Sequence, residues 1–291
     1  MAGEPLGEYV RRPPALPLRA LVAEYGGYRE AGAAPRVHRG LPSPYLTLIV
    51  TLDDPLVVAA HPDPRTPPGS YDTLVGGLHT TPALITHDGR QSGVQISLTP
   101  PGARALLGVP AGELSGLDLD GADVLGPLAC ELRERLREAP GWSERFAVLD
   151  EVLLRRVASA PAPAAEVQWA WRRVASSGGG VSVADLAAGV GWSTRHLAER
   201  FRREIGLGPK EACRVVRFHR VRRALQQAAL TGSRLTLADA AAAHGYCDQA
   251  HLAREFGALA GLPPSAWLAE EFPWFRNVQA AGLGTATDSW A

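Results

Sequence analysis

The chain has 291 residues, of which 46% are hydrophobic and 21% charged, and its formal net charge is zero. This composition is typical of a globular protein with well-formed cores, and the length favours about two domains. No run of 18 or more apolar residues and no signal-peptide core occurs, and the three cysteines are far apart, which argues against a membrane span, a disulfide framework and a compact zinc site. We therefore expect a cytoplasmic protein that needs no metal or other cofactor.

The neutral total hides a division of charge between the two halves of the chain. Residues 1–165 carry a net charge of −4, residues 166–291 carry +4, and the run from Arg195 to Arg223 alone carries +7. An asymmetry of this kind suggests that the C-terminal half meets a polyanion. By charge alone, a solvated helix face explains the run equally well.

The first hundred residues contain short runs that favour β-strands. Pro, Gly and Asp clusters separate them, and the clearest are "YLTLIVTL" (45–52), "PLVVAA" (55–60), "ALITHD" (83–88) and "GVQISLTP" (93–100). Short strands at this spacing predict an all-β barrel or sandwich.

After residue 101 the pattern becomes helical. Apolar residues recur at intervals of three and four, and they are Leu125, Leu128, Leu132, Leu136, Phe146, Leu149, Leu153 and Val157. The spacing predicts two amphipathic helices within 123–157, joined at "APGW" (139–142). Packing of the leucine stripe on the β-rich domain is the first interpretation; pairing of two chains into a homodimer is the alternative.

Composition also indicates where domains divide. The segment "ASAPAPAAE" (158–166) lacks periodicity and is the best linker candidate, and "SSGGG" (176–180) should end a helix that carries Trp169 and Trp171. We expect a sensor or regulatory domain at 1–160, a linker at 161–165, a second domain at 166–272 and a tail at 273–291.

Two stretches of the second domain nearly repeat each other. "VSVADLAAGVGWSTRHLAERFRREIGLGP" (181–209) and "LTLADAAAAHGYCDQAHLAREFGALAGLPP" (235–264) align at an offset of 54, then 55 residues. In each copy a Ser or Thr precedes a short apolar run, a glycine follows, and Ser193 or Asp248 precedes a second run. N-caps and a glycine turn at these places predict a helix-turn-helix unit, used twice.

Each second helix should present a buried face and an outward face. In copy one, Leu197, Phe201 and Ile205 form the apolar face; in copy two, Leu252, Phe256 and Leu259 do so. The opposite faces are suited to the major groove of DNA, where helix side chains reach base edges. Between the copies, "PKEACRVVRFHRVRRALQQAAL" (209–230) contains no breaker and predicts one long helix that fixes their separation.

On these motifs, residues 166–272 resemble the DNA-binding domain of the AraC/XylS family of bacterial transcription regulators. The resemblance implies a seven-helix, two-lobed domain that binds double-stranded DNA, with RNA polymerase as a further candidate partner. Carried onto matching positions, it implies base contacts from Thr194, Arg195, Ala198, Glu199, Arg202, Gln249, Ala250 and Arg254, with Ala253 nearby. It implies phosphate contacts from Ser193, Arg203, Arg214, Arg217 and His251. Packing is favoured for His196 and His251, which precede the core leucines, and few polar groups line the outward face of copy two.

The β-rich half resembles, more distantly, the cupin-like sensor domains found in many regulators of that family. An unidentified effector, either a small molecule or a protein, is therefore expected there. His38, His79 and His87 are separate and include no His-x-His pair, so each is expected to be an ordinary histidine. The expected fold is α+β: a β-rich, barrel-like N-terminal domain with amphipathic helices, then an all-α domain.

The alternative function is an enzyme or a DNA-repair protein fused to a DNA-binding domain. An alkyl-accepting repair domain needs an activated cysteine thiolate, and Cys130 is the only cysteine before the linker. No P-loop, G-x-S-x-G or H-E-x-x-H motif occurs, so we expect no catalytic residues.

Overall fold

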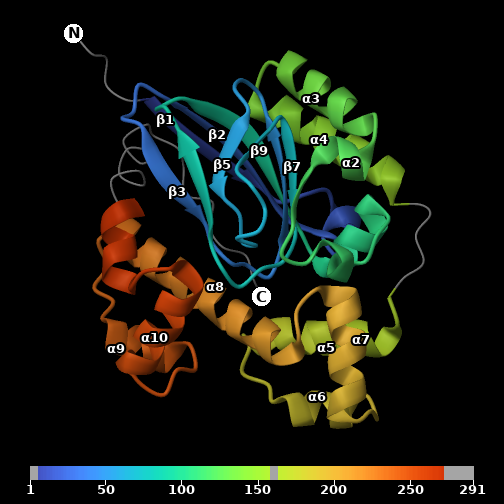
Figure 1. The fold of residues 1–291 in the computed structure, drawn as a ribbon, viewed down its shortest axis with the longest axis vertical. Helices are drawn as coiled ribbons and strands as arrows, with labels where there is room; N and C mark the ends of the chain where they lie inside the picture. The colour runs from blue at the N-terminus through green and yellow to red at the C-terminus, as the bar shows by residue number, and fades with distance from the viewer. Residues whose placement is uncertain (1–5, 158–162, 272–291) are drawn as a thin grey trace.

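The computed structural model describes residues 6–157 and 163–271. The N-terminal part consists of two antiparallel β-sheets with helices on one side, and the C-terminal part consists of helices (Figure 1). This confirms the predicted α+β class and the order of its two parts.

The larger sheet has six strands in the order β1-β2-β9-β4-β7-β10, and the smaller has four in the order β3-β8-β5-β6. The strands of the larger sheet are β1 (Leu6–Arg12), β2 (Val22–Ala31), β9 (Gln91–Leu98), β4 (Leu46–Thr51), β7 (Thr73–Gly76) and β10 (Asp118–Asp120). Those of the smaller sheet are β3 (Arg36–Gly40), β8 (Ala83–His87), β5 (Leu56–Ala60) and β6 (Gly69–Tyr71). All four strand runs quoted from the sequence contain a strand.

Short helical turns and three helices complete the N-terminal part. The turns are η1 (Leu16–Leu18), α1 (Pro100–Gly102), η2 (Ala103–Leu107) and η3 (Ala111–Leu114), and the helices are α2 (Gly121–Leu125), α3 (Leu128–Glu138) and α4 (Trp142–Arg156). The helices cover one face of the larger sheet (Figure 1). Alternate residues of its strands, such as Val94 and Ile96, are fully buried on that face because side chains along a strand point to opposite sides.

The leucine stripe of 123–157 lies inside this core. Leu132 and Leu136 are at most 1% exposed, and Phe146 stacks on Tyr25 of β2 with ring centroids 5.9 Å apart. The prediction of packing on the β-rich domain is confirmed, and pairing of two chains through this stripe is wrong because most of its leucines, Leu132 and Leu136 among them, are already buried. The first predicted helix is divided, since Gly126 has a φ of +62° and ends α2.

The C-terminal part contains the two predicted helix-turn-helix units. Its helices are α5 (Ala165–Ser176), α6 (Val183–Gly189), α7 (Thr194–Ile205), α8 (Pro209–Thr231), α9 (Leu237–Ala243) and α10 (Gln249–Ala260), followed by a helical segment at 264–271. The first unit is α6 and α7, the second is α9 and α10, and α8 joins them (Figure 1). The seven predicted helices are all present.

Local chemistry defines these units as the sequence indicated. Ser182 and Thr236 accept hydrogen bonds from the amides of Asp185 and Asp239, and each thereby caps a first helix. The turn that follows contains a glycine in the left-handed region, Gly191 in one unit and Gly245 in the other, with φ of +70° and +75°. Side chains disfavour this conformation, so glycine ends each first helix sharply.

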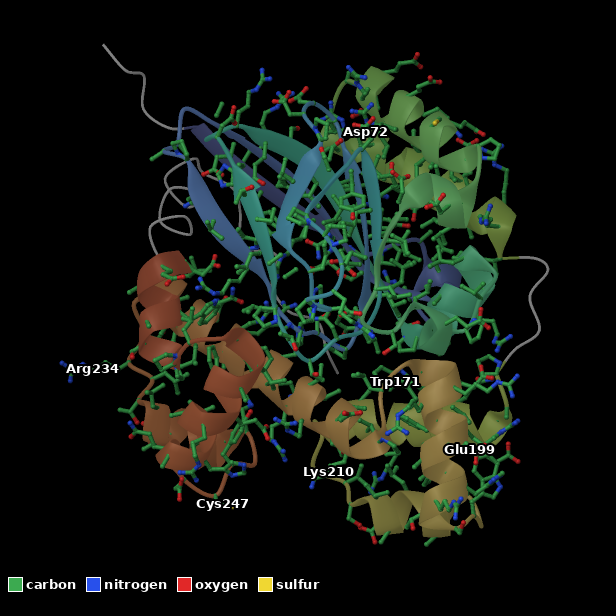
Figure 2. All side chains as sticks on the ribbon, in the orientation of Figure 1. Asp72, Trp171, Glu199, Lys210, Arg234 and Cys247 are labelled. Carbon is green, nitrogen blue, oxygen red and sulfur yellow. The ribbon has the colours of Figure 1, made fainter. Side chains whose placement is uncertain are left out.

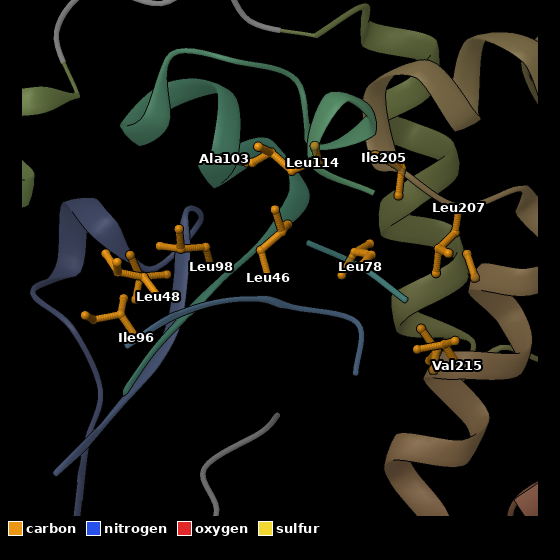
Figure 3. Close-up of a cluster of buried hydrophobic side chains, with 14 of the residues drawn as sticks. Leu46, Leu48, Leu78, Ile96, Leu98, Ala103, Leu114, Ile205, Leu207 and Val215 are labelled. Atoms are coloured by element: carbon orange, nitrogen blue, oxygen red, sulfur yellow. The ribbon is translucent and has the colours of Figure 1, made fainter. Parts of the chain in front are cut away.

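One apolar cluster runs through both parts of the molecule. Figure 3 shows Leu78 and Leu114 of the N-terminal part near Ile205 and Leu207 of the C-terminal part, and all four side chains are at most 6% exposed. The two parts are therefore packed together rather than separate in space. The domain division near residue 166 stays a prediction. Residues 161–162 of the expected linker and the whole expected tail lie outside the described residues. No helix in the described ranges is long and apolar enough to span a bilayer.

Candidate functional site

Both second helices point their N-terminal ends away from the β-sheets. Gly206, which ends α7, lies against Ala111 of η3, and a Cβ atom on Gly261, which ends α10, would lie 3.5 Å from Pro82. Cys247, just before α10, lies at the lower edge of the molecule in Figure 2, on the side opposite the sheets. The starts of α7 and α10 are therefore free on one side of the molecule, and in helix-turn-helix proteins these first turns contact base edges.

The outward face of α7 carries the residues predicted to read bases. Thr194, Arg195 and Glu199 are exposed and Ala198 is half-buried, whereas Leu197 and Phe201 on the opposite face are fully buried. Glu199 projects from the outer side of the helix in Figure 2. Ser193 caps the helix by accepting a hydrogen bond from the amide of His196 at 3.2 Å.

Two arginines at the end of α7 have different surroundings. Arg202 extends toward Gly208, whose Cβ, if present, would lie 2.9 Å from a terminal guanidinium nitrogen of Arg202. Its guanidinium is thus directed toward the junction with α8, one turn or more from the free end of the helix. Arg203 has an exposed side chain, but its carbonyl lies against Gly112 of η3.

The outward face of α10 carries fewer polar side chains than that of α7, as the sequence indicated. Gln249, Ala250 and Arg254 are exposed, Ala253 is half-buried, and Leu252 and Phe256 form the buried face. Three residues of the predicted set therefore lie together on an accessible face of the second unit.

Arg214 and Arg217, two of the predicted phosphate contacts, also make contacts within the protein. Both project from α8 to Glu255 of α10, at 3.1 Å and 3.4 Å, and the Glu255 side chain is only 8% exposed. Arg217 also lies over the ring of Tyr246, 5.2 Å from its centroid. These guanidinium groups hold the second unit on α8. Sequence reasoning missed Glu255, although Arg200 occupies the equivalent place in copy one and the change of charge sign was a usable signal.

The histidines before the core leucines pack against equivalent aromatic rings. His196 meets Trp192 edge-on with centroids 4.7 Å apart, and His251 meets Tyr246 at 5.3 Å. His251 Nδ1 also accepts a hydrogen bond from the amide of Cys247. The favoured packing interpretation agrees with these contacts in both units.

A cavity of about 550 Å³ lies between the two sheets and extends to α8. Polar side chains line it from the larger sheet, among them Thr47, Gln95 and Ser97, whereas Val58 and Ile85 line it from the smaller sheet. The lining is mixed on both sides, because the larger sheet also contributes Ile49 and Leu74 and the smaller sheet also contributes His38 and Arg39. The large apolar core lies on the opposite face of the larger sheet.

The part of α8 that borders the cavity is strongly basic. His219, Arg222 and Arg223 line it there, and burial together with the nearby charge of Arg223 lowers the pKa of Arg222 to about 10. Arg222 donates to His219 Nδ1 at 3.3 Å, and its buried Nε has no hydrogen-bond partner within the described residues. A cationic group buried with an unsatisfied donor is costly unless an acceptor meets it.

Known families match both parts of the chain. Residues 186–270, which include both second helices and α8, match a family described as a helix-turn-helix domain. The C-terminal part is an AraC-type helix-turn-helix domain. Residues 10–120 match a domain of unknown function, DUF6597, and no curated protein matches the chain significantly.

Solved structures are similar to the chain over most of its length. ToxT from Vibrio cholerae O395 is 11% identical with a TM-score of 0.48 and covers 91% of this chain and 97% of its own. Wild-type ToxT of strain SCE256 bound to unsaturated fatty acid is 9% identical, with a TM-score of 0.46 and coverages of 91% and 94%. The AraC-like transcriptional activator CuxR is 15% identical, with a TM-score of 0.27 and coverages of 75% and 86%. Because these values are low, the assignment of the AraC-type domain rests on its own sequence match and its geometry.

The three histidines considered in the sequence of the N-terminal domain each contact a different partner. His38 pairs with Glu271 that follows the AraC-type core, His79 Nδ1 bonds the carbonyl of Thr81, and His87 lies by Glu30. Within the described ranges no three His, Cys, Asp or Glu side chains gather in a way that could hold a metal ion.

Buried histidines should make the stability of the protein depend on pH. Burial lowers the pKa of His219 well below its usual range, and Arg222 and Arg223 nearby lower it further. The folded protein keeps this imidazole neutral while the unfolded chain takes up a proton below pH ~6.5, so stability is full above that pH and falls as pH decreases. One such group contributes at most about 1.4 kcal/mol per pH unit. Urea unfolding at pH 7.5 and 5.5 should show a smaller loss for His219→Gln than for wild type; equal losses would contradict this assignment.

Proposed function

We propose that the chain is a sequence-specific DNA-binding transcription regulator, not an enzyme, and that its N-terminal domain senses an effector. The observation that supports it most is the pair of helix-turn-helix units whose second helices start on the same free side. In the AraC-type domain, α8 sets the distance between the two units. At ~1.5 Å per residue its 23 residues span about 34 Å, close to one turn of B-DNA.

The proposed base readers are the exposed residues on the outward faces. In the first unit these are Thr194, Arg195 and Glu199, with the half-buried Ala198 close to the bases. In the second they are Gln249, Ala250 and Arg254. Arg202 is also proposed as a base reader. It lies farther from the first turn than the others, because its guanidinium is directed toward Gly208. Ser193, Arg203 and His251 are the proposed phosphate contacts, and Arg214 and Arg217 support them by fixing the second unit.

The test of DNA binding is its dependence on salt. Each phosphate that a basic side chain neutralises releases counterions, with a log–log slope of about −0.9 per contact. For the full chain on a 30-base-pair duplex, fluorescence anisotropy should show the binding constant falling by at least about tenfold between ~50 and ~200 mM salt. A binding constant that does not change over this range would contradict the proposal.

The cavity is the proposed effector site. Its mixed lining fits a small molecule with an apolar part against Val58 and Ile85 and an acidic group near Arg222, whose buried Nε needs an acceptor. A thermal-shift screen of the full chain against carboxylates and phosphates tests this, since a ligand at 100 times its Kd adds about 2.7 kcal/mol of stability. Arg222→Ala should abolish any shift. If a ligand stabilises Arg222→Ala as much as it stabilises the wild type, that ligand binds somewhere other than the proposed site.

Homodimerisation, RNA polymerase as a partner and a cytoplasmic location complete the proposal. Dimer contacts must use a surface other than the leucine stripe, which is buried. Leu154 of α4 is 39% exposed and is available for such a contact. Sedimentation of wild type and Leu154→Asp at micromolar concentration tests this surface: a dimer in both excludes it, and a monomer in both excludes the dimer.

A further inference from the structure

The N-terminal domain holds each helix-turn-helix unit at a different place. At the first unit, Arg104 bonds Glu204 of α7 at 2.8 Å and the Ser115 hydroxyl donates to the carbonyl of Gly206. Gly112 fits against the end of α7 so closely that a Cβ there would lie 2.2 Å from the carbonyl oxygen of Arg203. We name Arg104, Gly112, Ser115, Glu204 and Gly206 the first latch.

The second unit is held through the helical segment that follows it. Arg39 of β3 pairs with Glu270, and His38 Nδ1 lies 3.2 Å from a carboxylate oxygen of Glu271. These four residues are the second latch. It is polar throughout, and Glu270 is half exposed.

The two latches differ in their relation to the cavity. All four residues of the second latch line it, together with His219 and Arg222 of α8. None of the five residues of the first latch lines it. The first latch instead adjoins the continuous apolar core, where Ala103 and Leu114 meet Ile205 and Leu207 (Figure 3).

The latches should therefore differ in how readily they open. In each ion pair of the second latch one side chain is about half exposed, Glu270 at 51% and His38 at 48%. Water and other ions reach these pairs, so their members can exchange partners, whereas opening the first latch would expose packed apolar surface. An acidic group in the cavity can compete with Glu270 and Glu271 for Arg39 and His38. It finds no equivalent access to Arg104.

We infer that occupancy of the cavity acts on the second helix-turn-helix unit alone, by opening the second latch while the first unit stays docked. This inference rests on the proposed function, because it explains how an effector in the cavity would alter DNA binding. Movement of α9 and α10 relative to α7 changes the spacing of the two helix-turn-helix units. One unit then keeps its hold on the N-terminal domain while the other adapts to the DNA.

Hydrogen exchange of the full chain, followed by mass spectrometry, separates the two latches. Arg39→Ala should increase amide exchange in α9 and α10 several-fold and leave α6 and α7 within about twofold of wild type. Arg104→Ala, the matched control, should affect α6 and α7 and leave α9 and α10 unchanged. Exchange in β4 and β9 reports that each variant is folded. If either variant loosens both units alike, or neither has an effect, the inference is wrong.

A bulky side chain in the cavity tests the coupling without a ligand. Gln95 lines the cavity from the central strand β9, and Gln95→Trp should loosen α9 and α10 but not α6 and α7. Thr47→Trp on β4 repeats the test if Gln95→Trp fails to fold. An unchanged second unit in a folded variant would overturn the coupling. DNA binding by the full chain is measured separately, so failure here leaves the proposed regulator function standing.

Discussion

Replacement of Glu255 by alanine should destabilise the protein by about 3 kcal/mol. The carboxylate is 8% exposed and holds Arg214 and Arg217, so its removal leaves two guanidinium groups facing each other without a counter-charge. Breaking a buried ion pair from one side costs about 3–5 kcal/mol, and the partial exposure of Arg214 moves the expectation to the lower end. Urea unfolding of wild type and Glu255→Ala at pH 7 measures the difference.

Two further variants make the Glu255 result specific. Arg254→Ala removes the exposed neighbouring side chain and should change stability by less than about 0.5 kcal/mol. Glu255→Gln keeps the shape of the side chain but not its charge. Its loss of stability should lie between those of Glu255→Ala and Arg254→Ala. If Glu255→Ala is as stable as Arg254→Ala, the ion pairs do not hold the second unit on α8, and Arg214 and Arg217 return as candidates for phosphate contact.

Replacement of Arg195 by alanine should weaken binding to the preferred DNA site by ~1–3 kcal/mol, or about 5- to 150-fold. Arg195 is exposed in the first turn of α7, on the face opposite Leu197. A guanidinium donates two parallel hydrogen bonds to O6 and N7 of guanine, a pair of acceptors that no other base presents. Binding-site selection with Arg195→Ala should therefore show a lost preference at one base position.

Arg203 provides the contrast within the same helix. Its side chain is exposed near the end of α7 that is docked on η3, away from the free first turn. Arg203→Ala should weaken binding to all DNA sequences about equally or have no effect on binding, as expected of a phosphate contact. If Arg203→Ala alters the selected motif while Arg195→Ala leaves it unchanged, the proposed orientation of α7 on DNA is wrong.

Features set by neighbouring residues could be predicted from the sequence. Ser182, Ser193, Thr236 and Asp248 were recognised as caps because an N-cap bonds an amide two or three residues along the same chain. The buried faces of α7 and α10 followed from spacings of three and four. The candidate base readers followed in turn, because they occupy the faces opposite.

Features set by distant residues could not be predicted in this way. Arg214 and Glu255 are 41 positions apart, and only their contact shows that the arginine faces the protein. The leucine stripe fitted both packing and pairing until Leu132 was seen buried against the sheet. The cavity depends on how two sheets and α8 meet, and both latches join residues that are about 90 or more positions apart.

Selection of binding sites by the full chain from a pool of random duplexes tests the central claim most directly. Two units that read successive major grooves should enrich two short blocks whose centres lie one helical turn apart, at about 10–10.5 base pairs. The block read by the first unit should be the stronger, because α7 presents more polar groups than α10. A selected pool indistinguishable from the starting pool, or a single block without a partner at fixed spacing, would contradict a regulator that reads DNA with both units.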